Sequence, residues 1–433
     1  IHTQNPLSAL STSIRGIENL TILDLPLLTD MDFSAFVGIN EITLKSTETS
    51  DRATISLTLG NDQKLTLEEI VDGDTGGLSL IDGGVKILQD GSSETLRLNL
   101  KAVGSDPAKR NESLVIDVAG EKTSIVELET SEATSTHIQN SGGSLSTVNI
   151  LGSGSLDIFD SIPNSVKNLA AGDSTADITF TLTSNDFAAV TGSGDDTINL
   201  TDGAANVETN GGADLVTISG GTSHVIDTGA GKDRVAIALG NNFISLGDGD
   251  DIISSIGGTN TIELGSGNND ASITNGVNHL SSGNGNNQIG ISNGNNSVST
   301  GSGQDTITVS GGSNSLSPRQ GNDTVLISGG INNLDAGFGD DTITLTGGVN
   351  DIYAGAGNDT VTASGGSRNI DIRTLSGGAG TDILNIFSTG NVTLPAFIEF
   401  EEILSVCGDE VACAPEYSPT PGDMRPKIYF LTL

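Results

Sequence analysis

The chain has 433 residues, of which 55 are Asp or Glu and 18 are Lys or Arg, so its formal net charge is −37. This charge argues against nucleic acid and anionic membranes as partners, because both need basic patches on the protein. Glycine is abundant at 58 residues, Trp is absent and aromatic residues make up 3%. This composition favours short strands and turns over helical packing, and no apolar run is long enough to span a bilayer.

Residues 1–190 predict an all-β N-terminal region. Strand patterns recur at 53–59, 95–100, 113–120, 147–151 and 177–183. The phrase GIENLTI at 16–22 is similar to GINEITL at 38–44, and a relative, FEEILSV, occurs at 400–406. We expect irregular β-solenoid coils here, with an antiparallel insert near 50–120. Because the chain begins at Ile1 with neither a Met nor a signal peptide, we also expect a processed or excised fragment.

From residue 191 an 18-residue period takes over. Repeat starts, aligned on TGSGDD, lie at Gly192, Asn210, Gly229, Gly247, Gly265, Gly283, Gly301, Arg319, Gly337 and Gly355, with a single longer step between Asn210 and Gly229, and the pattern resumes at Gly378. Apolar residues keep this register at Ile198, Val216, Val235, Ile253, Ala271, Ile289, Ile307, Val325, Ile343 and Val361, and on the other half-coil at Val207, Val225, Ile244, Ile262, Leu280, Val298, Leu316, Leu334, Ile352 and Ile370. Two short alternating segments and two glycine turns per repeat predict a parallel β-roll of 18-residue coils over 191–406, ending in capping strands.

The tail at 407–433 is rich in proline, which disfavours strand pairing. We expect it to be a loop or a disordered end. An oxidising compartment would allow a disulfide between Cys407 and Cys413 within it.

One acidic position recurs in every regular repeat but two. Four residues after the repeat start lie Asp196, Asp214, Asp233, Asp251, Asn269, Asn287, Asp305, Asp323, Asp341 and Asp359, and Asp382 holds the same place after the insertion. Stacked coils would bring successive carboxylates within roughly 5 Å of each other, the distance between neighbouring strands. Like charges at that distance cannot all stay ionised and unpaired. Ca²⁺ between successive turns resolves the conflict, because it takes about six to eight oxygens from carboxylates and backbone carbonyls.

The segments GSGDDTINL, GDGDDIISS, GSGQDTITV, GFGDDTITL and GAGNDTVTA resemble the nonapeptide G-G-x-G-x-D-x-U-x of RTX (hemolysin-type calcium-binding) repeat proteins, which form Ca²⁺-bound parallel β-rolls. The resemblance covers about 192–386. It implies calcium ligands at Asp196, Asp214, Asp233, Asp251, Asp305, Asp323, Asp341, Asp359 and Asp382, and at the carbonyls of Gly192, Gly194, Gly212, Gly229, Gly231, Gly247, Gly249, Gly301, Gly303, Gly321, Gly337, Gly339, Gly355 and Gly357. Asn269 and Asn287 split the acids into two runs, for which we expect roughly six ions in all, with weak binding beside the gap.

The second half-coil departs from the RTX pattern, because its turn has the form S-G-G-x-N. An unbroken series of asparagines follows, at Asn242, Asn260, Asn278, Asn296, Asn314, Asn332 and Asn350. An amide both donates and accepts hydrogen bonds, so stacked asparagines can bond from coil to coil without an ion. We therefore predict calcium on one edge of the roll and an uncharged asparagine ladder on the other.

Catalysis is disfavoured by the same sequence, and we expect no enzyme. The four histidines form no H-E-x-x-H motif. The G-x-S-x-G match at 290–294 lies in repeat register, without the strand, elbow and helix that a nucleophilic serine needs. His224 and His279 are expected on the surface. Ice binding is also disfavoured, because the partial T-x-T face is broken by Arg234, Gln288 and Leu326.

The phrases IENLTIL, TSIVELETSEATSTHI and LSTVNILGSGSLDIF, and the segment 165–198, resemble the strand-rich segments that precede RTX repeats in bacterial surface-layer (S-layer) proteins. This resemblance implies type I secretion of an unfolded chain, folding in millimolar Ca²⁺, and an S-layer-like lattice or filament at the extracellular cell surface. The implied partners are further copies of the chain and cell-surface polysaccharide. The alternative is an RTX adhesin, or an extender module of a larger secreted protein.

Overall fold

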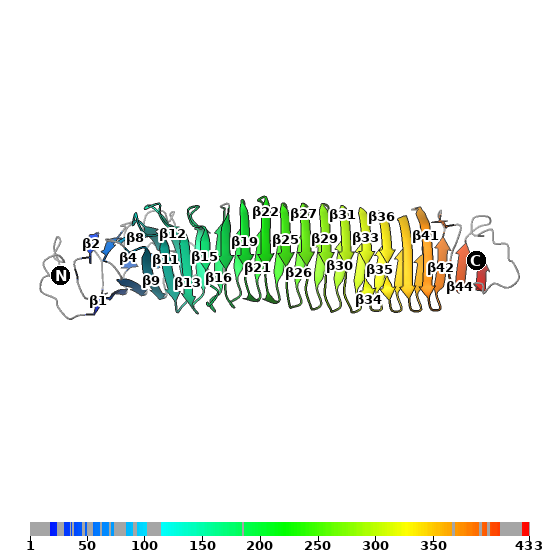
Figure 1. Ribbon diagram of the computed structural model, residues 1–433, viewed down its shortest axis with the longest axis horizontal. Helices are drawn as coiled ribbons and strands as arrows, with labels where there is room; N and C mark the ends of the chain where they lie inside the picture. Colours follow the sequence, from blue (N-terminus) through cyan, green and yellow to red (C-terminus); the bar gives the residue numbers. More distant parts are fainter. Residues whose placement is uncertain are drawn as a thin grey trace. The chain divides into compact units, whose positions relative to one another are not determined.

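The computed structural model describes residues 18–23, 30–34, 36, 39–45, 48–49, 55–60, 63–68, 71–72, 84–89, 93–101, 114–183, 186–365, 369–388, 392–395, 399–407 and 427–432. The chain divides into two compact units, Ile1–Thr222 and Ser223–Leu433. The described residues form β-strands and turns, with no helix among them (Figure 1).

In the first unit, the strands alternate between two parallel sheets. One sheet contains β1 (Asn19–Leu23), β3 (Glu41–Lys45), β6 (Lys64–Glu68), β9 (Thr95–Lys101), β11 (Ile125–Thr130), β13 (Thr147–Gly152), β15 (Asn168–Ala170), β17 (Phe187–Val190) and β19 (Ala204–Glu208). The other contains β2 (Asp30–Asp32), β5 (Ile55–Leu59), β8 (Gly84–Gln89), β10 (Leu114–Val118), β12 (Thr134–Gln139), β14 (Leu156–Ser161), β16 (Ile178–Leu182), β18 (Thr197–Leu200) and β21 (Leu215–Ile218). Short strands β4 (Glu48–Thr49), β7 (Val71–Asp72) and β20 (Gly211–Gly212) lie in turns. Each coil contributes one strand to each main sheet.

The predicted solenoid in the N-terminal region is confirmed, but the predicted antiparallel insert is wrong for the described strands. The similar phrases at 16–22 and 38–44 form neighbouring coils, in which Asn19 pairs with Glu41. Between 50 and 120, β5 pairs with β8 and β6 pairs with β9, both in parallel. The physical reason is the length of the connections. Lys64 pairs with Arg97, so the chain between them is much longer than one regular coil, and the strands on either side of the extra residues keep the same direction.

The solenoid continues through residue 190, where the sequence changes its repeat type. Thr134 pairs with Leu156 in one sheet, and farther along the same sheet Thr179 pairs with Thr197, a closer spacing in sequence. In the other sheet, Ala189 pairs with Val207. The change of repeat is therefore a shortening of the coil within the same two sheets.

The second unit has the same construction. One sheet contains β22 (Ser223–Asp227), β25 (Asn241–Ser245), β27 (Thr259–Glu263), β29 (Val277–Ser281), β31 (Asn295–Ser299), β33 (Ser313–Ser317), β36 (Ile331–Asp335), β39 (Gly348–Ala356), β41 (Ile370–Ala379) and β43 (Val392–Thr393). The other contains β24 (Arg234–Ile237), β26 (Ile252–Ser255), β28 (Asp270–Ile273), β30 (Gln288–Ile291), β32 (Thr306–Val309), β35 (Thr324–Ile327), β38 (Thr342–Leu345), β40 (Thr360–Ala363), β42 (Ile383–Ser388), β44 (Glu402–Cys407) and β45 (Lys427–Thr432). Short strands β23 (Ala230–Gly231), β34 (Arg319–Gln320) and β37 (Gly337–Phe338) lie in the turns.

A thin aliphatic core lies between the two sheets of this unit. Ile244, Ile262 and Leu280 are fully buried in neighbouring coils, as the predicted register requires. Two positions of the predicted register are wrong, and the first is Val225. This residue is 46% exposed, and Ile226 is the buried partner of Ile244.

The second wrong position is Ile370. Both errors have the same physical origin, because in each case extra residues are accommodated within a half-coil and shift the register. The single longer step of the repeat falls before β22, so it moves every following residue of that strand by one position. Farther along, a register shift lies between Asn350 and Asp351, and Leu375 instead of Ile370 pairs with Ile352. Ile370 is still buried, opposite Gly348.

The Pro-rich tail contains a strand, contrary to the expectation of a loop or disordered end. β45 pairs in parallel with β44, from Glu402 opposite Lys427 to Cys407 opposite Thr432. The prolines precede this strand, so they leave its amides available for pairing. Residues 408–426 and the side chain of Cys407 lie outside the described residues, so the Cys407–Cys413 disulfide stays a prediction.

Candidate metal centre

At the second glycine of the G-x-G-x-D turn, neighbouring coils approach each other so closely that only glycine fits. Gly321 has φ +140°, and a Cβ there would lie 1.5 Å from the carbonyl oxygen of Gly303. At Gly249 a Cβ would lie 1.6 Å from the oxygen of Gly231. The glycines are therefore required by the backbone stacking that brings successive Asp turns together.

The repeated Asp lies at the end of this turn, immediately before a strand, and is buried. The nine predicted Asp residues are each at most 1% exposed. Within the second unit, the backbone N–H of Asp305 donates to Asp323 Oδ1, and the N–H of Asp323 donates to Asp341 Oδ1, both at 2.8 Å. Within the first unit, the N–H of Asp196 donates to Asp214 Oδ1 at 2.8 Å. We call this row of side chains the Asp ladder.

The second carboxylate oxygen is the unsatisfied part of the Asp ladder. Among the described residues, a buried Oδ2 without a hydrogen-bond partner occurs at Asp196, Asp251, Asp305, Asp323, Asp341, Asp359 and Asp382. A buried anionic oxygen without a donor is unfavourable by several kcal/mol, on the order of the desolvation penalty of one ion. Either a proton or a cation must compensate for it.

Burial makes these carboxyl groups weak acids in the metal-free protein. Desolvation, with smaller contributions from neighbouring carboxylates, raises the pKa of Asp196, Asp251 and Asp323 to about 6 and the pKa of Asp341 to about 7. Desolvation likewise raises the pKa values of Asp359 and Asp382. The Asp ladder is therefore electrostatically strained at neutral pH unless positive charge is supplied.

The side-chain amide of Asn287 marks the place in the turn where a hydrogen-bond donor or a cation is needed. Its Nδ2 donates to the carbonyl oxygen of Gly285 at 3.0 Å and to Asp305 Oδ1 at 2.8 Å. Asn269 makes the same two contacts, to Gly267 O and to Asn287 Oδ1, at 3.4 and 3.2 Å. In an Asp turn the side chain has no N–H with which to make these two bonds. Carboxylate and carbonyl oxygens are left there without this donor.

This donor set fits a hard cation that is coordinated by oxygen. No group of three or more His, Cys, Asp or Glu side chains gathers around one point in the described part of the chain. Each site thus has at most two carboxylates, and backbone carbonyls such as that of Gly285 must complete it. Carboxylate and carbonyl oxygens together are the ligands that Ca²⁺ prefers, whereas Zn²⁺ prefers His and Cys.

Asn269 and Asn287 do not interrupt the Asp ladder structurally. The N–H of Asp251 donates to Asn269 Oδ1, and the N–H of Asn287 donates to Asp305 Oδ1. The sequence identified this pair only as a gap in the acids. The structure shows two coils whose own amides make the bonds that a cation would make elsewhere.

The opposite edge of the roll carries the predicted asparagine ladder, which is confirmed. Each Nδ2 donates at 2.9 Å to Oδ1 of the next asparagine, through Asn242, Asn260, Asn278, Asn296, Asn314, Asn332 and Asn350. The same nitrogens donate to a carbonyl three residues earlier, such as Asn275 O for Asn278. Both amide hydrogens are used, so this edge needs no ion.

Two residues at the ends of the asparagine ladder were not identified from the sequence. His224 pairs with Asn242, donates its N–H to Asn242 Oδ1 at 3.2 Å and is fully buried, so the expectation of a surface residue is wrong. The extra residue before β22 turns His224 inward. At the other end, Ile372 pairs with Asn350. His279 is exposed, as predicted.

Replacing Asn296 by Ala should lower the free energy of unfolding by roughly 2–4 kcal/mol, because buried donors and acceptors of both neighbouring coils lose their partner. Urea unfolding in about 10 mM Ca²⁺ measures this change. Asn295→Ala is the matched control, since Asn295 is the exposed neighbour in the same strand. Calcium stoichiometry should remain unchanged in both variants. Equal destabilisation by the two substitutions would contradict a stabilising role of the asparagine ladder.

Comparison with known proteins agrees with this geometry. The family model described as RTX calcium-binding nonapeptide repeat (4 copies) matches residues 238–271, 291–325 and 327–361. No curated protein and no solved structure was found to match the chain. Within the described residues, no helix is long and apolar enough to cross a membrane. The chain therefore carries RTX calcium-binding nonapeptide repeats, built into a parallel β-solenoid.

Proposed function

We propose that the protein is an extracellular structural protein whose roll binds several Ca²⁺ ions along the Asp ladder. The observation that carries this proposal is the buried Oδ2 of residues such as Asp323 and Asp341, which has no donor. Asn287 makes the corresponding site neutral by placing an amide there. The ligands would be the nine repeated Asp residues with carbonyls of the turn glycines, on this edge only.

Binding of this kind couples calcium to folding. A stacked coil is the only arrangement that brings two Asp turns together, so the unfolded chain offers no such site. The net charge of −37 opposes compaction until cations neutralise part of it. These properties support export of an unfolded chain that folds in the calcium of the extracellular medium.

Assembly at the cell surface is the function that we infer for the folded roll. The similarity of the N-terminal phrases to surface-layer proteins supports an S-layer-like lattice or filament of further copies, with cell-surface polysaccharide as the anchor. In this reading the roll is a stiff calcium-dependent building element and has no catalytic role. A module that only spaces an adhesive domain from the cell would need the same roll and no self-association.

Both parts of the proposal can be tested by comparing the full chain in EGTA with the full chain in about 10 mM Ca²⁺. This concentration lies above the typical dissociation constants of extracellular calcium modules. We expect calcium to increase the β signal in circular dichroism and the midpoint of thermal unfolding. Negative-stain microscopy of the same samples should show sheets or filaments that dissolve in EGTA. A monomer under both conditions would favour the spacer module, and an absence of bound calcium would refute the metal sites.

A further inference from the structure

A carboxylate from outside the repeats continues the Asp ladder at its C-terminal end. The N–H of Asp382 donates to Glu401 Oε2 at 2.9 Å, and the N–H of Asp359 donates to Asp382 Oδ1 at the same distance. Each is the bond that one member of the Asp ladder makes to the next. Glu401 therefore occupies the position of the next Asp, with a side chain one methylene longer.

Strand register independently places Glu401 at this position. Each Asp of the ladder immediately precedes a strand of the same sheet, and Glu401 immediately precedes β44, whose first residue, Glu402, pairs with Ile383. The N–H of Glu402 donates to Asp382 O, as the N–H of Ile383 donates to Asp359 O in the coil before. The sequence before Glu401, FIEF, lacks the repeat glycines, and the matched family segments end at residue 361.

The site between Asp382 and Glu401 has an unsatisfied buried oxygen. Asp382 is fully buried, and its Oδ2 has no hydrogen-bond partner among the described residues. Within the same residues, neither carboxylate forms an ion pair with Lys or Arg. Asp382 Oδ2 lies beside Gly377, where only the absence of a Cβ leaves room for this oxygen. Gly380, with φ +150°, has the conformation of the second glycine of the G-x-G-x-D turns, such as Gly357 with φ +147°.

We propose that Asp382 and Glu401 bind a further calcium ion, which joins the last repeat turn to the capping coil that contains β44. This inference rests on the proposed function of the Asp ladder. It assigns a ligand that no nonapeptide pattern contains, and it makes attachment of the capping strand dependent on calcium.

Three variants of the full chain test the site by calcium stoichiometry at pH 7.5 and by hydrogen exchange of β44. Glu401→Gln should bind one ion fewer than the wild type, and exchange of the β44 amides should accelerate about tenfold or more, because local opening becomes easier. Asp382→Asn should also bind one ion fewer. Its β44 amides should nevertheless stay protected in EGTA, because an amide at residue 382 can donate to Glu401 as Asn287 donates to Asp305.

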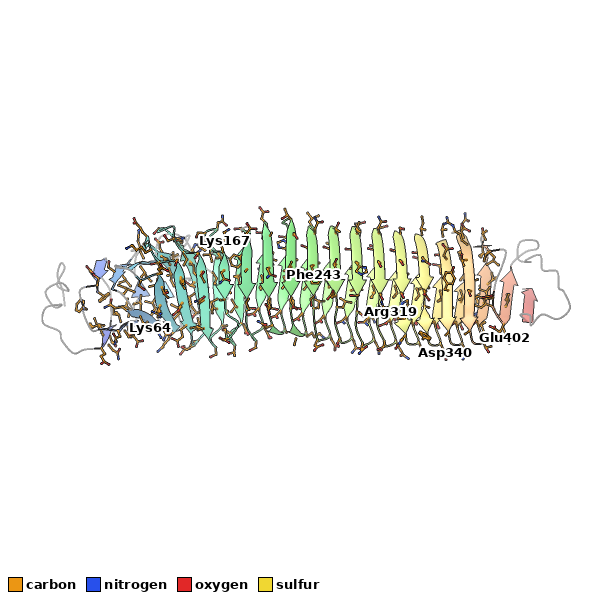
Figure 2. The ribbon with its side chains drawn as sticks, viewed as in Figure 1. Lys64, Lys167, Phe243, Arg319, Asp340 and Glu402 are labelled. Atoms are coloured by element: carbon orange, nitrogen blue, oxygen red, sulfur yellow. The ribbon has the colours of Figure 1, made fainter. Side chains whose placement is uncertain are left out.

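Glu402→Gln is the matched control, since it removes the same charge one residue away, on the outer face of β44 (Figure 2). It should leave the calcium stoichiometry at the wild-type value. Wild-type stoichiometry in Glu401→Gln, with calcium still bound by the repeats, would overturn this site and leave the proposed function standing. A wild-type chain without bound calcium would overturn both.

Discussion

Without calcium, the protein should unfold at a higher temperature at about pH 5 than at about pH 7.5, the reverse of ordinary acid denaturation. The cause is the Asp ladder. Burial raises the pKa of Asp251 and Asp323 to about 6 and that of Asp341 to about 7 in the folded protein, from 3.8 for an unperturbed Asp. A protonated Oδ2 becomes a donor and can make the contact that Nδ2 of Asn287 makes.

The sign follows from proton linkage. When the folded pKa lies above the unfolded pKa, the folded state binds more protons between the two values, so stability falls as pH rises through that window. Here the window runs from about 4 to about 7. Each pKa unit corresponds to about 1.4 kcal/mol. Each such carboxyl therefore lowers the free energy of unfolding by on the order of 3 kcal/mol when the pH rises through the window.

Relief of general charge repulsion would also favour the fold in acid, so the prediction needs a control that separates the two effects. Asp341→Asn removes a buried member of the Asp ladder and should weaken the pH dependence. Asp340→Asn removes the same charge from the exposed neighbour (Figure 2), whose Oδ1 accepts the N–H of Asn358 at 2.7 Å. Thermal unfolding of both variants in EGTA gives the comparison. Equal pH dependence in both would assign the effect to overall charge.

Calcium should reverse the pH dependence, because the ion and the proton compete for the same oxygens. At about 10 mM Ca²⁺ the midpoint should rise strongly at pH 7.5 and little at pH 5. An equal increase in the unfolding midpoint at both pH values would mean that the ions bind away from the carboxyl groups of the Asp ladder whose pKa is raised.

Periodicity in the sequence predicted the features that repeat, because a stacked solenoid places equivalent residues on top of each other. Asp323 and Asp341 share one ladder and Asn314 and Asn332 share another, as their spacing predicts. The same logic fails at insertions. An extra residue can be accommodated in a turn or in a strand, and the sequence does not distinguish the two. The pairing of Ile226 with Ile244 shows that the extra residue before β22 changes the register of Val225 and His224.

Glu401 was missed for a related reason. Nothing in FIEFEE has the glycine spacing of the repeats, so the residue is recognisable only through the bond from Asp382 and the pairing of β44. The parallel insert strands near 50–120 were missed because long connections hide the coil period. The sequence therefore predicts the sites that lie within the repeats. Sites next to the repeats, such as that of Glu401, are recognised only from the strand pairing in the structure.

Replacing Asn269 and Asn287 together by Asp should destabilise the metal-free protein at neutral pH and add calcium sites. Each substitution converts a bridging amide into a carboxylate whose Oδ2 faces a glycine carbonyl and the next member of the ladder. An uncompensated buried charge typically costs about 3–5 kcal/mol, so the loss in EGTA should be large. In about 10 mM Ca²⁺ the variant should recover its stability and bind more ions than the wild type.

Asn268→Asp combined with Asn286→Asp is the matched control, because both residues are the exposed neighbours of the buried pair. It adds the same charge to the same turns and should change neither quantity appreciably. The two double variants are compared by urea unfolding in EGTA and by the number of calcium ions bound at pH 7.5. Equal destabilisation by the two double variants would mean that charge alone matters. Destabilisation confined to Asn269 and Asn287, and reversed by calcium, would show that two amides in the wild type replace ions. The coils around them could then stack before any calcium binds and provide the first ordered surface for the Asp turns on either side.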